Sequence, residues 1–422
     1  MRYIKRKNIL VIIALTISCL LSGCRKKDTN VIDSLENFEK NIESISIEET
    51  KISEEVQQWE KGYDLPVDAQ ERKEAEIDCK TLMELYFEIY DSADKGIASN
   101  VILEDEIVLK IQKKLKDTGY PITTMVTYSN MENYEIVDSF LESCIDGQIS
   151  SVIIYEIHDD GAINRMKFTF DGTDMYVISA RSVWNENGGS GISYIAHNRI
   201  KEWKYTNKGW FGYEVCVPEP PEVSEVMDGS CLIRVKPMTQ EQREMSERCV
   251  LELGYQGQNL LCSNWNVENL SELDYNGIFE YLYKMKYKEN FISEDYQTGI
   301  PKEEFERLIM EYLPVTAEQI REYSVFNEKH QTYSWIRLGY VNYPLTFFGT
   351  SIPEVVAIKK NEDGTVILTV DAVCDMVICD DALITHELTV RFEEDGSFQY
   401  LGNKILNDGI MQIPDYQYRV KE

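Results

Sequence analysis

Histidine is scarce in this chain, with four among 422 residues. None of the four stands in an H-E-x-x-H motif, and the chain has no G-x-S-x-G motif and no cysteine with a nucleophile signature. It also lacks a Walker loop, a dinucleotide fingerprint and any Cys-x-x-Cys pair. The sequence therefore shows no motif for a zinc site, for nucleotide binding or for a Ser–His or Cys–His nucleophile. We therefore expect no cofactor and no metal.

Basic residues are also few, because 43 Lys and Arg face 73 Asp and Glu, which gives a net charge of −30. A chain this acidic repels the phosphate backbone, so nucleic acid is excluded as a main partner. Apolar residues at 43% and aromatics at 11% indicate globular domains and not a disordered chain.

The start of the chain contains its one long apolar run, which spans residues 9–21. Thirteen residues are too few for a membrane span of about 20 and fit the core of a signal peptide. Arg2 and residues 5–7 supply the positive region that precedes such a core. Residues 1–23 are therefore predicted to be a signal peptide.

The run ends at Leu21-Ser22-Gly23-Cys24, which resembles the lipobox of bacterial lipoproteins. The resemblance implies that the thiol of Cys24 carries a lipid and that Cys24 becomes the new N-terminus. The membrane is then a partner through this anchor, and the protein is expected on the outer face of the cytoplasmic membrane. Removal of residues 1–23 takes away four positive charges, so the net charge falls from −30 to −34.

Residues 24–75 are predicted to be an acidic helical linker. Apolar residues occupy eight of nine heptad core positions between residues 31 and 59: Val31, Leu35, Phe38, Ile42, Ile45, Ile52, Val56 and Trp59. They indicate either a stalk or a coiled-coil contact with a partner, or else one helix or two short helices that pack on the protein's own domain. Ser44, Ser46 and Thr50 weaken the middle of the segment and favour the second interpretation.

Residues 76–236 are predicted to form the first domain. Apolar residues at helical spacing predict a helix from Cys79 to Tyr90 and a second from Ile107 to Leu115. A third helix, up to Cys144, is expected to begin at Asn130 as its N-cap. The period then changes to two, and turn residues divide residues 153–217 into about six antiparallel strands.

Residues 237–422 are predicted to form the second domain, in which Thr239 and Thr316 begin helices. Alternating residues then predict strands at 366–370, 384–392 and 398–400. The predicted fold class is α+β with two domains, each made of helices followed by an antiparallel meander.

Eight cysteines remain besides Cys19 and Cys24. Cys79 and Cys144 are in phase with apolar helix faces and are interpreted as buried thiols. Cys374 and Cys379 are the one close pair, and their spacing leaves open whether they form a disulfide.

Two further features could carry chemistry. His386 alternates with Leu388 and Val390 along a predicted strand, so its side chain is expected on the same, core-facing side. It is therefore interpreted as a core histidine and not a catalytic one. Four carboxylates lie between Asp371 and Asp381, where a weak calcium site is an alternative to a solvated acidic loop. The spacing does not match an EF-hand, and we favour the solvated loop.

Several short segments resemble an uncharacterised lipoprotein family of Gram-positive anaerobic bacteria. They are residues 93–96, 130–134, 170–173 and 385–392. The resemblance implies a surface lipoprotein and assigns no reaction and no site residue.

The sequence therefore favours a non-enzymatic, lipid-anchored module that binds an unidentified protein or saccharide. The alternative is a cell-envelope hydrolase of glycosidase type. Such an enzyme needs two carboxylates that face each other at about 5–10 Å. With 73 acidic residues in the chain, the sequence does not single out such a pair.

Overall fold

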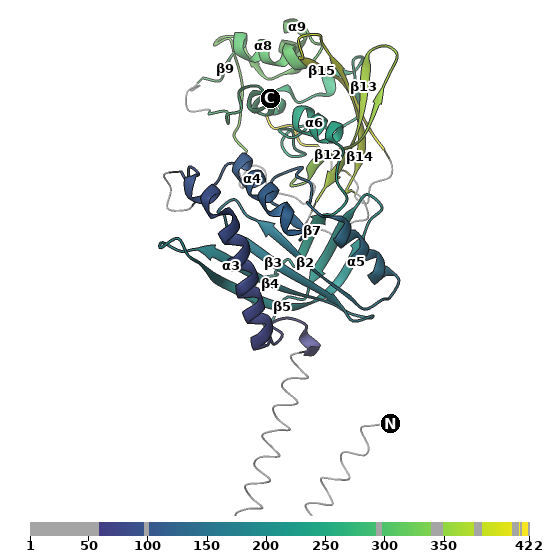
Figure 1. Ribbon diagram of the computed structural model, residues 1–422. Helices are drawn as coiled ribbons and strands as arrows, with labels where there is room; N and C mark the ends of the chain where they lie inside the picture. The colour runs from purple at the N-terminus through teal and green to yellow at the C-terminus, as the bar shows by residue number, and fades with distance from the viewer. Residues whose placement is uncertain are drawn as a thin grey trace, which may run out of the picture. The chain divides into compact units, whose positions relative to one another are not determined.

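The computed structural model describes residues 59–96, 101–292, 298–338, 349–374, 382–406, 413 and 416–420 (Figure 1). Cys24, Cys379 and the heptad positions before Trp59 lie outside the described residues. Residues 61–422 form one compact unit that contains two large sheets. Among the helices that the structure describes, none is long and apolar enough to span a membrane.

Three helices of the first half cover its sheet, and their bounds are α3 (Ala69–Ser92), α4 (Asp105–Leu115) and α5 (Glu135–Ile145). Helix α3 begins inside the range that the sequence assigned to the linker, because the Asp68 side chain accepts a hydrogen bond from the Glu71 N–H and caps it. Cys79 and Cys144 are buried on these helices, which confirms their interpretation as core thiols.

The prediction that Asn130 caps the third helix is wrong. Helix α5 begins five residues later, and Tyr134 occupies its N-cap without a side-chain hydrogen bond. The Asn130 amide instead pairs with the backbone of Met238, with both distances at 2.9 Å. Because the Asn130 amide bonds to this distant backbone, it does not cap helix α5.

The first sheet has seven strands in the order β1-β2-β3-β4-β5-β6-β7. Their bounds are β1 (Ile122–Thr124), β2 (Ser150–Ile157), β3 (Ile163–Phe170), β4 (Met175–Trp184), β5 (Ser190–Tyr205), β6 (Trp210–Val215) and β7 (Ser230–Arg234). All neighbours are antiparallel except β1 and β2. Residues 153–217 contain five strands where about six were predicted, because Ser190–Tyr205 forms the one continuous strand β5.

Both faces of this sheet are covered. Tyr155 and Ile163 belong to the core under α3 and α4, whereas Ile154 and Phe168 belong to the core under α5. Figure 1 shows α3 lying across the strands β3, β4 and β5. The alternation along each strand therefore buries apolar residues in two layers.

The second half also begins with helices, namely α6 (Gln240–Cys249), α7 (Tyr275–Tyr287), α8 (Lys302–Tyr312) and α9 (Ala317–Tyr323). The predicted starts at Thr239 and Thr316 are confirmed. Each threonine hydroxyl accepts a hydrogen bond from the backbone N–H of a glutamine three residues later. The side-chain oxygen of that glutamine in turn accepts a hydrogen bond from the threonine backbone N–H.

The second large sheet has the order β12-β13-β14-β15-β8. Its strands are β12 (Ile352–Lys360), β13 (Thr365–Val373), β14 (Thr385–Phe392), β15 (Phe398–Ile405) and β8 (Trp265–Asn266). Leu368, Leu388 and Tyr400 are buried in the core that α6–α9 share. Thr369 and Thr389, on the opposite face, are partly exposed.

A small sheet, β10-β11-β9, joins Phe326–Asn327, Thr332–Tyr333 and Ile300–Pro301. Helices and antiparallel sheets in both halves confirm the α+β class. The division of the compact unit into domains at residues 236 and 237 stays a prediction.

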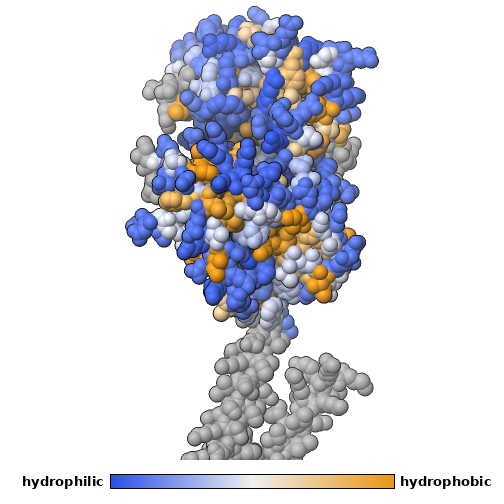
Figure 2. Space-filling model, viewed as in Figure 1, coloured by the Kyte–Doolittle hydropathy of each residue, from blue (hydrophilic) through white to orange (hydrophobic). Residues whose placement is uncertain are grey.

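The surface seen in Figure 2 is largely hydrophilic, as the net charge requires. Hydrophobic residues gather on this face over the part that Figure 1 labels α4 and α5. Leu109, Ile136 and Ile145 are exposed on these helices. Single exposed aliphatic residues are ordinary on a soluble domain and define no site by themselves.

Candidate functional site

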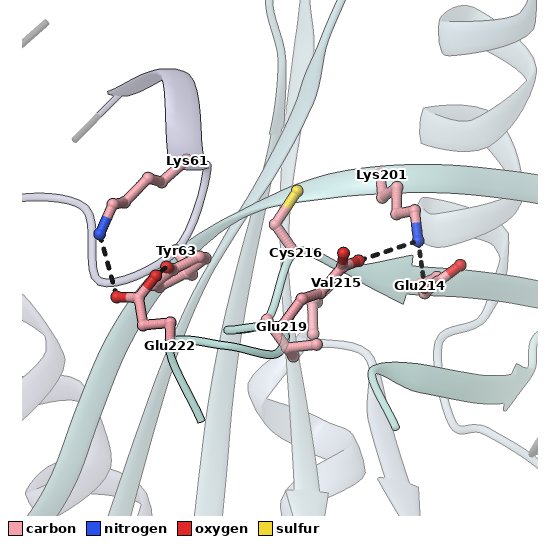
Figure 3. A pocket seen from close by; sticks show the side chains of 9 residues that line it. Lys61, Tyr63, Lys201, Glu214, Val215, Cys216, Glu219 and Glu222 are labelled. Atoms are coloured by element: carbon pink, nitrogen blue, oxygen red, sulfur yellow. Dashed lines mark hydrogen bonds and ion pairs between the residues drawn. The ribbon is translucent and has the colours of Figure 1, made fainter. Parts of the chain in front are cut away.

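A charged pocket of about 300 Å³ lies where the chain enters the compact unit. Lys61 and Tyr63 reach it from the segment before α3, and Glu222 reaches it from the loop after β6 (Figure 3). The Lys61 Nζ lies 3.0 Å from the Glu222 carboxylate, to which the Tyr63 hydroxyl also donates. These two donors hold the pKa of Glu222 below its usual value.

The other wall of the pocket is also ion-paired. Lys201 Nζ lies 2.9 Å from the Glu214 carboxylate and 3.9 Å from that of Glu219. Cys216 lies between the two ion-paired groups in Figure 3. Because each carboxylate of this pocket has a cation beside it, we interpret the pocket as a clasp that fixes the entering chain.

Gly62 is the tight point of this clasp. Its φ is +82°, and a Cβ there would lie 2.8 Å from the Cys216 Sγ and 3.1 Å from the Arg199 Nε. We expect Gly62→Ala to lower the free energy of unfolding by about 2–4 kcal/mol, through left-handed strain and these close contacts. Gly364→Ala is the matched control, since its φ is +81° and no atom lies within 4 Å. Urea unfolding that gives equal losses for both variants would contradict the contact argument.

A second concavity, of about 460 Å³, lies on the part-exposed face of the second sheet and is here called the amide groove. Besides the buried Asn403, its polar residues are Asn264, Asn266 and Asn269 on one side and Glu387, Thr389 and Lys404 on the other. The first three belong to β8 and its flanking turns, and the others to β14 and β15. The volume falls within the range of about 300–1,000 Å³ that is typical of small-molecule sites.

Gly402 allows β8 to approach β15 at the floor of the amide groove. It pairs with Asn266, and a Cβ on Gly402 would lie 3.0 Å from the Trp265 carbonyl oxygen. The groove was not found from the sequence, because asparagines at this spacing read as turn residues. Its two walls are more than 100 residues apart in the chain.

His386 lies buried beneath this groove, which confirms its interpretation as a core histidine. The Asn403 amide donates to the carbonyls of Leu261 and Ser263, so its oxygen faces the His386 Nδ1 at 2.6 Å. The proton therefore resides on Nδ1, and Nε2 accepts from the Tyr255 hydroxyl at 2.9 Å. Burial lowers the pKa of His386 to about 4, although the Asn403 hydrogen bond opposes this shift.

A buried ionic cluster joins the two large sheets. Arg234 at the end of β7 donates to the Glu354 carboxylate on β12 and stacks 4.1 Å from the Trp210 ring. Lys208, in the turn before β6, lies 2.8 Å from the Asp371 carboxylate on β13. Burial raises the pKa of Glu354, and Arg234 opposes this effect. We interpret this cluster as a structural link between the sheets.

Asp371 is therefore not part of a solvated loop, and that interpretation is wrong for this residue. It is 1% exposed, and it accepts from the Thr385 hydroxyl at 2.7 Å in addition to Lys208. Asp375, Asp380 and Asp381 lie outside the described residues. Within the described ranges, no group of three Asp, Glu, His or Cys residues is arranged to hold a metal ion.

The buried thiols are held in their protonated form. Burial raises the pKa of Cys79, Cys249 and Cys262 to about 12, whereas a reactive cysteine has a lowered pKa. Cys374 is buried, and its predicted neighbour Cys379 is outside the described residues, so their pairing stays open.

The chain belongs to a family of unknown function, DUF6070, whose model matches residues 72–419. The match covers α3 and nearly everything that follows it, including both large sheets. No curated protein and no solved structure matches the chain. The prediction that the chain belongs to an uncharacterised family is therefore confirmed. The lipoprotein character that the resemblance implied stays a prediction.

Proposed function

We propose that this chain is a lipid-anchored, extracytoplasmic binding protein that holds its ligand in the amide groove. The observation that carries the proposal is the set of polar groups in the groove that the fold itself does not use. In the clasp, by contrast, both lysines and all three carboxylates are engaged in ion pairs with one another. A groove with unused donors on a covered, hydrogen-bonded floor is a feature of binding sites.

The alternative of a carboxylate-dependent hydrolase has less support at this site. A glycosidase places an acid and a second carboxylate on either side of the bond it cleaves. The described lining of the amide groove contributes one carboxylate, Glu387, and Lys404 is its cross-strand neighbour. This arrangement suits binding better than acid–base hydrolysis.

Photo-crosslinking in intact cells of the source bacterium tests the proposal. We expect benzoylphenylalanine in place of Leu401, which lines the groove, to form ultraviolet-dependent adducts with the full-length protein. The same group at Glu186, an exposed turn residue of the first sheet, is the control and is expected to form none. Absence of adducts at position 401, or equal adducts at both positions, would refute binding in the groove.

The anchor is supported by the sequence from Arg2 to Cys24. We expect Cys24→Ala to block processing or to release the protein from membranes, because the thiol carries the lipid. Cys19→Ala is the matched control and should leave anchoring unchanged. Fractionation that finds the Cys24→Ala protein processed and still bound to membranes would remove the lipid anchor from the proposal.

A further inference from the structure

Three asparagine amides of the groove use their oxygens within the fold and leave their N–H groups unused. The Oδ1 atoms of Asn264, Asn266 and Asn269 accept from the backbone N–H groups of Ile405, Glu268 and Asn266, at 2.7, 2.7 and 2.6 Å. A backbone N–H can only donate, so it fixes each amide with its oxygen inward. Within the described residues, the three Nδ2 groups have no protein acceptor.

The wall that carries these amides is rigidly supported. Asn403 is 3% exposed and ties the carbonyls of Leu261 and Ser263 to β15 just before Asn264. His386 holds the oxygen of the same Asn403 amide from below. The unused donors are therefore preorganised, so a ligand would not have to order them on binding.

The opposite wall offers complementary groups without net charge. Glu387 on β14 and Lys404 on β15 are cross-strand partners, and Thr389 lies two residues beyond Glu387 on the same face. Together they present a carboxylate, an ammonium group and a hydroxyl. Leu401 and Ile405 supply apolar surface between these polar groups.

We infer that the ligand of the amide groove is an uncharged, hydroxyl-rich oligosaccharide, an inference that rests on the proposed function. A sugar hydroxyl both donates and accepts, so it can satisfy amide donors on one wall and the Glu387 carboxylate on the other. The C–H faces of the sugar rings would contact Leu401 and Ile405. An ionic ligand finds no net charge here, because Glu387 and Lys404 offset each other. An extended peptide is recognised mainly through backbone bonds to a strand edge, whereas these donors are side chains over a sheet face.

The test uses the purified mature lipoprotein in detergent and calorimetric titration with cello-, chito-, malto-, manno- and xylotriose. We expect the wild type to bind at least one of these trisaccharides. Asn266→Asp and Asn269→Asp keep the capping oxygen but replace the free donor with an acceptor, so each should weaken that binding by about 3- to 10-fold. Asn185→Asp is the matched control, because its Oδ1 also accepts backbone N–H groups but in a turn of the first sheet.

Two results would overturn the saccharide assignment. One is that no trisaccharide binds, and the other is that binding is equally strong in both groove variants. If position 401 still forms adducts in cells while all trisaccharides fail, the groove binds a different class of ligand and the proposed function stands. Recovery of a peptide from that adduct would identify an extended peptide as the ligand.

Discussion

Replacing Arg234 by methionine will lower the free energy of unfolding by about 3–5 kcal/mol at pH 7, because it leaves a buried carboxylate without its cation. The Arg234 side chain is 11% exposed and that of Glu354 is 5% exposed, so water cannot take the place of the lost partner. The change also removes the stacking of Arg234 on Trp210. Urea unfolding midpoints at constant m-value measure the loss.

The double variant Arg234→Met/Glu354→Leu separates the stranded charge from lost packing. We expect it to recover most of the stability, because replacing both partners of a buried ion pair with apolar residues is often neutral. Lys208 and Asp371 remain to neutralise each other beside it. If the double variant is no more stable than Arg234→Met, the stranded carboxylate is not the cause.

The loss in Arg234→Met should also depend on pH with a definite sign. Burial already raises the pKa of Glu354 above its unfolded value, and removal of Arg234 raises that pKa further. The folded variant therefore takes up a proton before the unfolded chain does, so its deficit is largest at neutral pH and shrinks as the pH falls toward about 4.5. Lys360→Met is the control, since it breaks an exposed ion pair between β12 and α6 and should cost less than about 1 kcal/mol.

His386 is expected to make the protein acid-sensitive. Its pKa is about 4 in the folded state, whereas an unfolded histidine titrates near about 6.5. Between these values the unfolded chain binds a proton that the folded chain does not bind. Stability should therefore fall by about 3 kcal/mol as the pH drops from about 6.5 to about 4.

The variant His386→Gln isolates this contribution from the many carboxylates of the chain. At pH 7 it should be about 1–3 kcal/mol less stable than the wild type, because an amide replaces the ring only imperfectly between Tyr255 and Asn403. The two unfolding free energies should converge as the pH approaches 4, since the variant has no group to protonate there. Profiles that stay parallel from pH 7.5 to pH 4 would show that the ring does not remain neutral, and His330→Gln, in an exposed loop, serves as the control.

Local patterns of the sequence were sufficient to predict most of the helices and strands. The helix starts at Thr239 and Thr316 depend on hydrogen bonds to residues only three positions away. The alternation of His386 with apolar residues along its strand correctly placed it in the core. The anchor at Cys24 likewise follows from adjacent residues alone and remains a prediction of the sequence. Such features are readable because neighbours in the chain are also neighbours in a helix turn or a strand.

The tertiary structure alone decided where the polar side chains of the chain find their partners. Asn130 bonds to a backbone 108 residues away, Arg234 to a carboxylate 120 residues away and Lys208 to one 163 residues away. The amide groove likewise needs Gly402 to admit a strand that is 136 positions earlier in the chain. A side-chain amide or carboxylate bonds to whatever donor or acceptor the fold brings within about 3 Å, and its own neighbours in the sequence do not specify that group.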